Sequence, residues 1–358
     1  MSEARIPVTL FTGFLGSGKT TLLNRLIGTP AFARAAVVIN EFGEMAIDHL
    51  LVDSPLEHLV VLDNGCICCS ARGDLAGALR TLARGHEEGV PAFDRVLVET
   101  TGLADPVPLM ETLCEDAHMA ERYRPHGVIT MVDGVNAAGQ LEEFAEPVKQ
   151  VAIADRLLVS KPDLAAPEVL DRLEARLRAL NPGAPILRVV TTGTDAATAL
   201  GPAWQPEAEG AFDWLARADQ VARAAGNDRS EHLASSESLQ TFTLWHDAPV
   251  TRAGLVLWLD KLAGLKGAQL LRMKGVLNVE GEPVAVHAVQ RIVHEPVFLP
   301  RWPDQERRSR LVFITRGLAR ETVEHTLDAL GFALGSKRSR FVDPETYARF
   351  VAASGRFR

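Results

Sequence analysis

The hydrophobic pattern in the first half of the chain alternates short β-branched runs with amphipathic stretches. Apolar runs predict strands at Val8–Phe11, Ala36–Ile39, Leu59–Leu62, Arg95–Glu99, Gly127–Val132, Arg156–Ser160 and Ile186–Val190. Helical periodicity between these runs predicts helices at Lys19–Ile27, Asp74–Gly85, Pro106–Cys114, Val135–Glu143 and Ala166–Leu180. Near-continuous apolar strands that alternate with amphipathic helices are typical of an α/β domain, in which helices cover both faces of a mainly parallel sheet.

The pattern changes twice in the second half of the chain. From Thr191 to about Ser238, Gly, Ala, Pro, Ser and scattered acids dominate, with one predicted helix near Phe212–Ala224. The elements predicted after it are strand Gln240–Trp245, helix Arg252–Leu262, strands Gln269–Val279, Val284–Val293 and Arg310–Thr315, and helix Arg320–Ala329, with a hairpin turn at Gly281-Glu282-Pro283. The sequence therefore predicts an α/β domain over residues 1–192, a linker over 193–238 and a smaller α+β domain over 239–358.

Composition and charge narrow the class of protein. Hydrophobic residues make up 47% of the 358 residues and charged residues 23%, as in ordinary globular proteins. The formal net charge of −8 argues against nucleic acid or an anionic membrane as the main partner, since both attract basic surfaces. No stretch approaches the roughly 18 uninterrupted apolar residues that would span a bilayer, and Met1–Pro7 lacks the apolar run of a signal peptide. We therefore expect a cytoplasmic protein.

One segment matches the phosphate-binding pattern GxxxxGK[ST] in full: Gly13-Phe14-Leu15-Gly16-Ser17-Gly18-Lys19-Thr20. Backbone N–H groups of such a loop converge on phosphate oxygens, Lys19 supplies positive charge to the β- and γ-phosphates, and the Thr20 hydroxyl binds Mg²⁺. A predicted strand enters the segment and a predicted helix leaves it, which disfavours a chance match by a glycine-rich turn. The predicted nucleotide-binding residues here are Gly13, Gly16, Ser17, Gly18, Lys19, Thr20 and Thr21.

An acidic residue ends the predicted strand Arg95–Glu99, where the run Glu99-Thr100-Thr101-Gly102 begins. A phosphate-loop enzyme needs an acid beside the Mg²⁺ shell and a mobile element that senses the γ-phosphate. We predict the first role for Glu99 and the second for the Gly102 backbone N–H, so Lys19, Glu99 and Gly102 are the catalytic candidates. A solvated acid at a strand end is the alternative, which the preceding phosphate loop disfavours.

The run Ser160-Lys161-Pro162-Asp163 follows another predicted strand and resembles the [NT]KxD loop of GTPases. In that loop the carboxylate accepts hydrogen bonds from the guanine N1–H and exocyclic amine, and the lysine stem lies along the purine. Lys161 and Asp163 therefore favour GTP over ATP as the nucleotide. Ser160 stands where Asn is usual, which predicts a guanine contact that is weaker or differently supported. A solvated turn is the alternative interpretation.

Three of the four cysteines lie within four residues, as Cys66-Ile67-Cys68-Cys69. Thiolates bind soft or borderline metal ions, and the spacing of this CxCC motif lets two sulfurs converge on one ion such as Zn²⁺. The candidates for a further ligand are Glu41, Glu44, His49 or water. Buried structural thiols and a redox pair of Cys66 with Cys69 are the alternatives.

These motifs together resemble the CobW-type metallochaperone GTPases, relatives of the GTPases that mature hydrogenase and urease. The resemblance rests on the phosphate loop with Thr21-Leu22-Leu23-Asn24, on Asn40-Glu41-Phe42-Gly43-Glu44, on Gly65-Cys66-Ile67-Cys68-Cys69, on Glu99-Thr100-Thr101-Gly102-Leu103-Ala104-Asp105-Pro106, on Ser160–Asp163, on Lys274–Leu277 and on Ser309–Ile314. It implies that the CxCC cysteines bind zinc or cobalt and that GTP hydrolysis drives transfer of the ion to a client metalloprotein. The resemblance does not decide whether the protein forms a homodimer.

Two departures from the family pattern change these expectations. Many members carry a histidine-rich tract near the linker, whereas this chain offers only His232 and His246 there, which argues against metal buffering. Met45-Ala46-Ile47-Asp48 replaces the usual Ile-Gly-Ile-Asp, a change expected to alter the stiffness of the switch. Two rival hypotheses stay open: an ATP-dependent kinase or other phosphotransferase, and a non-enzymatic, metal-responsive GTP-binding regulator.

Overall fold

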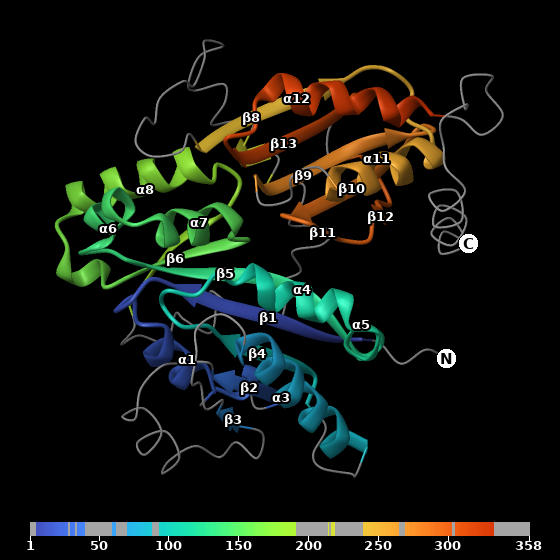
Figure 1. Cartoon of the computed structure of the whole chain (residues 1–358). Coiled ribbons are helices and arrows are strands. Elements are labelled where there is room, and N and C mark those ends of the chain that lie inside the picture. Colours follow the sequence, from blue (N-terminus) through green and yellow to red (C-terminus); the bar gives the residue numbers. More distant parts are fainter. Residues whose placement is uncertain are drawn as a thin grey trace. The chain divides into compact units, whose positions relative to one another are not determined.

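The structure is a computed structural model that describes residues 5–27, 29–32, 34–39, 59–61, 70–87, 93–190, 214, 216–218, 239–264, 269–302 and 305–332. The chain forms two compact units, Met1–Pro206 and Glu207–Arg358 (Figure 1). Within the described residues, no helix combines the length and the apolar character needed to cross a membrane.

The first unit is built on a seven-stranded sheet in the order β3-β2-β4-β1-β5-β6-β7, and every neighbouring pair is parallel. Its strands are β1 (Ile6–Gly13), β2 (Ala35–Ile39), β3 (Leu59–Val61), β4 (Arg95–Glu99), β5 (Tyr123–Asp133), β6 (Arg156–Ser160) and β7 (Ile186–Val189). All seven strands predicted from the apolar runs are confirmed, because strands buried on both faces have the most continuous hydrophobic pattern.

Helices cover both faces of this sheet, as predicted. They are α1 (Lys19–Ile27), α3 (Ser70–Glu87), α4 (Val107–Glu115), α5 (Ala117–Arg122), α6 (Ala137–Glu143), α7 (Ala145–Ile153) and α8 (Pro167–Leu180), with short 3₁₀ turns η1 (Pro30–Phe32) and η2 (Pro162–Leu164). The apolar face of α1 packs on Phe11, Ile129 and Met131 of the central strands. The adjacent residue of β5, Thr130, points the other way and donates a hydrogen bond to the backbone oxygen of Gln150 in α7.

Two helices of the first unit, α5 and α7, were not predicted from the sequence. Helix α5 has six residues, and its signal is Asp116, whose side chain accepts hydrogen bonds from the backbone N–H groups of His118 and Met119. Helix α7 carries Pro147 in its first turn, where proline is tolerated because the N–H of that position has no partner inside the helix.

The second unit is a six-stranded antiparallel sheet in the order β11-β10-β9-β13-β8, in which β12 pairs with β10. Its elements are β8 (Leu239–His246), α11 (Arg252–Gly264), β9 (Leu270–Val279), β10 (Glu282–Val289), β11 (Ile292–Val293), β12 (Val297–Phe298), β13 (Ser309–Arg316), α12 (Arg320–Glu324) and η3 (His325–Gly331). Buried residues of α11, such as Trp258, share one core with Met273 of β9 and Phe313 of β13. The smaller α+β domain predicted for this region is confirmed.

Three local predictions in the second unit need correction. The predicted strand Val284–Val293 is divided at Gln290, whose positive φ of 51° turns the chain between β10 and β11. The predicted hairpin turn lies one residue earlier, at Glu280 and Gly281, which both have positive φ, so Glu282 and Pro283 already belong to β10. The predicted helix Arg320–Ala329 becomes 3₁₀ after Glu324.

Candidate functional site

Four functional segments begin where neighbouring parallel strands end. Gly13 ends β1, Glu99 ends β4, Asp133 ends β5 and Ser160 ends β6. The strand order β4-β1-β5-β6 places these ends side by side at the carboxyl edge of the sheet. Ligands of open parallel sheets bind at this edge, so the topology alone brings the predicted nucleotide-binding segments together.

The phosphate loop has a backbone that depends on glycine. Gly13, Gly16 and Gly18 have positive φ values of 145°, 73° and 89°. A Cβ atom at Gly13 would lie 2.3 Å from the backbone oxygen of Met131, closer than any real contact. The hydroxyl of Ser17 is buried without a hydrogen-bond partner among the described residues. A tight loop that holds an unused donor is suited to an anionic group such as a phosphate.

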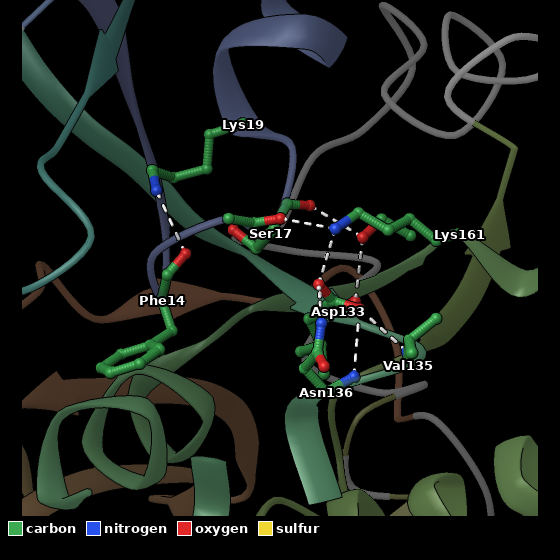
Figure 2. Close-up of polar contacts among 10 residues, drawn as sticks. Phe14, Ser17, Lys19, Asp133, Val135, Asn136 and Lys161 are labelled. Atoms are coloured by element: carbon green, nitrogen blue, oxygen red, sulfur yellow. Dashed lines mark hydrogen bonds and ion pairs between the residues drawn. The ribbon is translucent and has the colours of Figure 1, made fainter. Parts of the chain in front are cut away.

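Lys19 lies across the phosphate loop and is buried (Figure 2). Its ammonium donates to the backbone oxygen of Gly13 at 2.9 Å and to that of Phe14 at 3.4 Å. The structure therefore holds this cation at the loop, where the sequence predicts contact with the β- and γ-phosphates.

Thr20 and Glu99 form an oxygen-rich pair beside the loop. The Thr20 hydroxyl donates to Glu99 Oε1 at 2.6 Å, and the Glu99 side chain is completely buried. A hydroxyl and a carboxylate are hard oxygen ligands of the kind that Mg²⁺ prefers. The two residues predicted to serve the magnesium ion thus lie in contact, and their chemistry fits that ion.

The loop after β4 packs directly against the phosphate loop. A Cβ atom at Gly102 would lie 2.7 Å from the backbone nitrogen of Leu15 and 2.8 Å from its Cα. Thr100 anchors the start of the loop, since its hydroxyl donates to that of Thr12 at 2.9 Å. The predicted sensor of the γ-phosphate, Gly102, is therefore in van der Waals contact with the loop that would hold that phosphate.

The predicted base-reading loop, Ser160–Asp163, is held against the phosphate loop by hydrogen bonds. Lys161 has a left-handed backbone, with φ of 52°, and its ammonium donates to the Gly16 backbone oxygen at 2.8 Å (Figure 2). The Ser160 hydroxyl donates to the Ser17 backbone oxygen at 2.7 Å, so the residue that replaces the usual Asn supports the phosphate loop. Asp163 lies in η2 with an exposed side chain.

Asp133 belongs to this site and was missed by the sequence analysis. Its buried carboxylate forms an ion pair with Lys161 at 2.7 Å and accepts from the backbone N–H groups of Val135 and Asn136 at 2.8 and 3.2 Å (Figure 2). Burial raises its pKa, but the hydrogen bonds from Lys161, Val135 and Asn136 outweigh that effect and hold the pKa below its usual range. The available signal was an acid that ends a central strand, followed by Gly134.

For the remaining predicted site residues, the described part of the chain shows no contact at the carboxyl edge of the sheet. Thr21 is exposed on α1. Cys66, Cys68, Cys69, Glu41, Glu44 and His49 lie outside the described residues, so the CxCC metal site stays a prediction. Within the described part of the chain, no cluster of three or more His, Cys, Asp or Glu side chains is arranged to hold a metal ion.

Comparison with known proteins finds two family models along the chain. Residues 7–188 match the CobW/HypB/UreG nucleotide-binding domain, and residues 239–331 match the cobalamin synthesis protein CobW C-terminal domain. The chain is 33% identical to the zinc chaperone YjiA of Escherichia coli over 89% of this chain and 96% of that protein. It is 24% identical to the zinc-regulated GTPase metalloprotein activator 1 of Saccharomyces cerevisiae over 91% and 83% of the two chains.

The structure also resembles a solved one over most of its length. The crystal structure of Zn(II)-bound YjiA GTPase from E. coli aligns with a TM-score of 0.64 and 28% sequence identity, covering 92% of this chain and 99% of that chain.

Proposed function

The chain belongs to the CobW/HypB/UreG family and is a GTPase, and on that premise we propose that it is a metallochaperone that uses GTP to deliver zinc to a client protein. One observation carries the GTP-dependent part of this proposal: Lys19, the Thr20–Glu99 pair and Gly102 meet at the end of the sheet where a bound triphosphate would lie. Each group has the chemistry that phosphoryl transfer needs, because that reaction depends on positioning and on stabilising the charge of the phosphates.

The chain's own residues divide this work among them. Lys19 neutralises charge on the β- and γ-phosphates, and the glycine-rich backbone supplies N–H donors to the phosphate oxygens. Thr20 and Glu99 would hold a Mg²⁺ ion, which would neutralise charge on the phosphates. Gly102 presents its backbone to the γ-phosphate and moves away when that phosphate leaves.

Guanine recognition is assigned to Lys161 and Asp163. The two hydrogen bonds of Lys161, to Gly16 and Asp133, fix the start of the base-reading loop against the phosphate loop. Asp163 follows in η2, with a side chain that is accessible to a base. Its carboxylate offers only acceptors, which match the N1–H and amino donors of guanine.

Zinc is the proposed cargo, held by Cys66, Cys68 and Cys69 with a carboxylate from Glu41 or Glu44, and cobalt is the second candidate. The relatives named above support zinc: one is called a zinc chaperone, another a zinc-regulated GTPase metalloprotein activator, and the aligned crystal structure is Zn(II)-bound. Thiolates bind zinc strongly, and a carboxylate from the switch segment would link the ion to the nucleotide state.

A zinc-transfer assay tests this function. The zinc-loaded protein is mixed with an apo acceptor metalloprotein, and transfer is followed with GTP, GDP, a non-hydrolysable GTP analogue or ATP. We expect zinc transfer with GTP and with none of the other nucleotides. Transfer should be lost in Lys19→Ala, because this substitution removes the cation at the phosphates. Preference for ATP would favour a phosphotransferase. Equal transfer with GTP and the analogue would favour a regulator for which GTP is only a signal.

A further inference from the structure

Helix α7 contacts the nucleotide site at two places that the roles above do not use. The residue before the helix, Phe144, lies against the phosphate loop, with its ring centroid 4.9 Å from that of Phe14. In the last turns of the helix, Gln150 donates from Nε2 to the Gly102 backbone oxygen at 3.1 Å and to the Ala104 backbone oxygen at 3.2 Å. One helix therefore touches both the phosphate loop and the loop after β4.

Gln150 is a fixed donor rather than a mobile surface side chain. Only 1% of it is exposed, and its own backbone oxygen accepts from the Thr130 hydroxyl at 2.8 Å. Its Oε1 atom is buried without a hydrogen-bond partner among the described residues, which is a cost that an apolar residue would not carry. That cost indicates that the side chain is used for its two donor bonds to the loop.

The loop that receives these bonds lies in close contact with the phosphate loop. Gly102 lies so close to Leu15 that any side chain at position 102 would collide with the Leu15 backbone. Two bonds from one amide fix the carbonyl of Gly102 and, two residues later, that of Ala104. The amide thereby holds the Gly102 backbone beside the phosphate loop and, through its Cα, the N–H that is assigned to the γ-phosphate.

We infer that Gln150 is a positioning residue for the GTPase reaction, which sets the distance of the Gly102 N–H from the γ-phosphate by holding the carbonyl of the same residue. This inference rests on the proposed function of Gly102. GDP has no γ-phosphate, so Gln150 matters for GTP binding and hydrolysis and not for GDP binding. A residue with only a structural role would affect both nucleotides alike.

Two variants and two matched controls test this role. Gln150→Met keeps the volume and removes both donors, whereas Gln150→Glu keeps the shape and places a carboxylate opposite two carbonyl oxygens. Gln140→Met, on α6, is the control for the glutamine, since the Gln140 side chain makes no hydrogen bond within the described residues. Lys149→Met removes the neighbouring ion pair with Asp105, which is partly exposed and expected to contribute little.

The first readout is steady-state GTP hydrolysis. We expect kcat to fall about 10- to 100-fold in both Gln150 variants, with KM raised by no more than about tenfold, because misplacing a group that contacts the γ-phosphate weakens the transition state more than it weakens GTP binding. Both controls should stay within about twofold of the parent protein. Hydrolysis within twofold of the parent in Gln150→Met would overturn the inference.

The second readout does not depend on turnover. The ratio of the affinities for a non-hydrolysable GTP analogue and for GDP should fall about tenfold in Gln150→Met, with GDP affinity unchanged. Equal losses for both nucleotides would overturn the inference and leave Gln150 a structural residue. If the parent protein fails to hydrolyse GTP, the proposed function fails, and the affinity ratio still decides the role of Gln150.

Discussion

Lys161 carries a backbone conformation that is strained for a residue with a side chain. Its φ of 52° lies in the left-handed region, which costs a non-glycine residue about 1–2 kcal/mol. Contacts on both sides offset this cost, since the ammonium bonds the Gly16 backbone oxygen and the Asp133 carboxylate. Strain at a position held by several contacts is typical of functional sites. Here those contacts join the base-reading loop to the phosphate loop.

Asp133→Asn should destabilise the first unit by about 2–3 kcal/mol at pH 7, because it removes a charge-assisted acceptor of several hydrogen bonds. The pKa of Asp133 is lowered in the folded protein, so its carboxylate stabilises the fold above the usual pKa of 3.8. That contribution is lost as the pH falls through the lowered pKa. Urea unfolding of both proteins between pH 7 and pH 3 measures the difference.

The control for this prediction is Asp171→Asn, which breaks an ion pair of Arg188 with a carboxylate that is 71% exposed. Exposed pairs contribute about 0–1 kcal/mol, so this variant should unfold close to the parent protein. A stability difference for Asp133→Asn that already disappears between pH 7 and pH 5 would contradict the assigned pKa direction.

Asp163→Asn should change which base the site accepts. The amide adds a donor where guanine also donates, so GTP binding should weaken by about 2–4 kcal/mol. Xanthosine triphosphate, whose 2-oxo group accepts hydrogen bonds, should bind more tightly. Competition binding with GTP, xanthosine triphosphate and ATP measures this shift. The control is Glu168→Gln, an exposed carboxylate nearby on α8. Unchanged GTP affinity in Asp163→Asn would remove Asp163 from base recognition.

Residues with a fixed motif spacing could be predicted from the sequence, and the residues that support them could not. Lys19, Glu99 and Lys161 stand in patterns set by the chemistry of phosphates, magnesium and guanine, and the structure places them at one edge of the sheet. Asp133 and Gln150 each bond a residue that lies far away in the sequence, Lys161 in the first case and Gly102 in the second. Such pairings depend on strand order, which periodicity does not encode.

At the scale of elements, the sequence predicted long or buried segments better than short ones. The bounds of α1, β4 and β6 agree with the prediction residue for residue, because a buried strand or an amphipathic helix has a strong pattern. Helix α7 has nine residues and an early proline, so its pattern is weak on its own. It depends on tertiary contacts, and these include the contacts with the nucleotide site.

A further tertiary contact, at the C-terminal end of α7, gives a prediction for the helix itself. Asn181 is completely buried, and its Nδ2 donates to the backbone oxygens of Val151 at 2.9 Å and Ala154 at 2.9 Å, where the helix ends. Asn181→Ala removes these buried hydrogen bonds, although the Val151 oxygen keeps the bond from the Ala154 N–H, and should destabilise the first unit by about 1–3 kcal/mol. Urea unfolding measures the change.

A matched variant shows whether the loss comes from the helix end. Asn24→Ala removes an exposed asparagine from α1 and should change stability by less than about 0.5 kcal/mol. Equal stability of Asn181→Ala and the parent protein would mean that water or a shift of α7 replaces the lost bonds.

At the scale of the whole molecule, the chain carries a nucleotide unit and a second unit, and each matches its own family model. The predicted linker over 193–238 separates the two matched regions, and its boundaries stay a prediction. The two matches together identify the chain more specifically than the phosphate loop does, since phosphate loops occur in many unrelated enzymes. The proposed chaperone function also requires that the nucleotide state be connected to the metal cargo, which makes coupling the property to test.

Zinc affinity should depend on the bound nucleotide if Glu41 or Glu44 completes the site of Cys66, Cys68 and Cys69. Coupling is reciprocal, so zinc must change GTP affinity by the same factor as GTP changes zinc affinity, and about 1–3 kcal/mol corresponds to roughly 5- to 150-fold. Competitive zinc titration of the apo, GDP-bound and analogue-bound protein measures this factor, and binding should weaken as the pH falls because the thiols must lose protons. The same titration of Cys66→Ser and Cys68→Ser identifies the site, since strong binding in both would place zinc elsewhere. Equal affinity in all three nucleotide states would leave a zinc protein and a GTPase without the coupling that delivery requires.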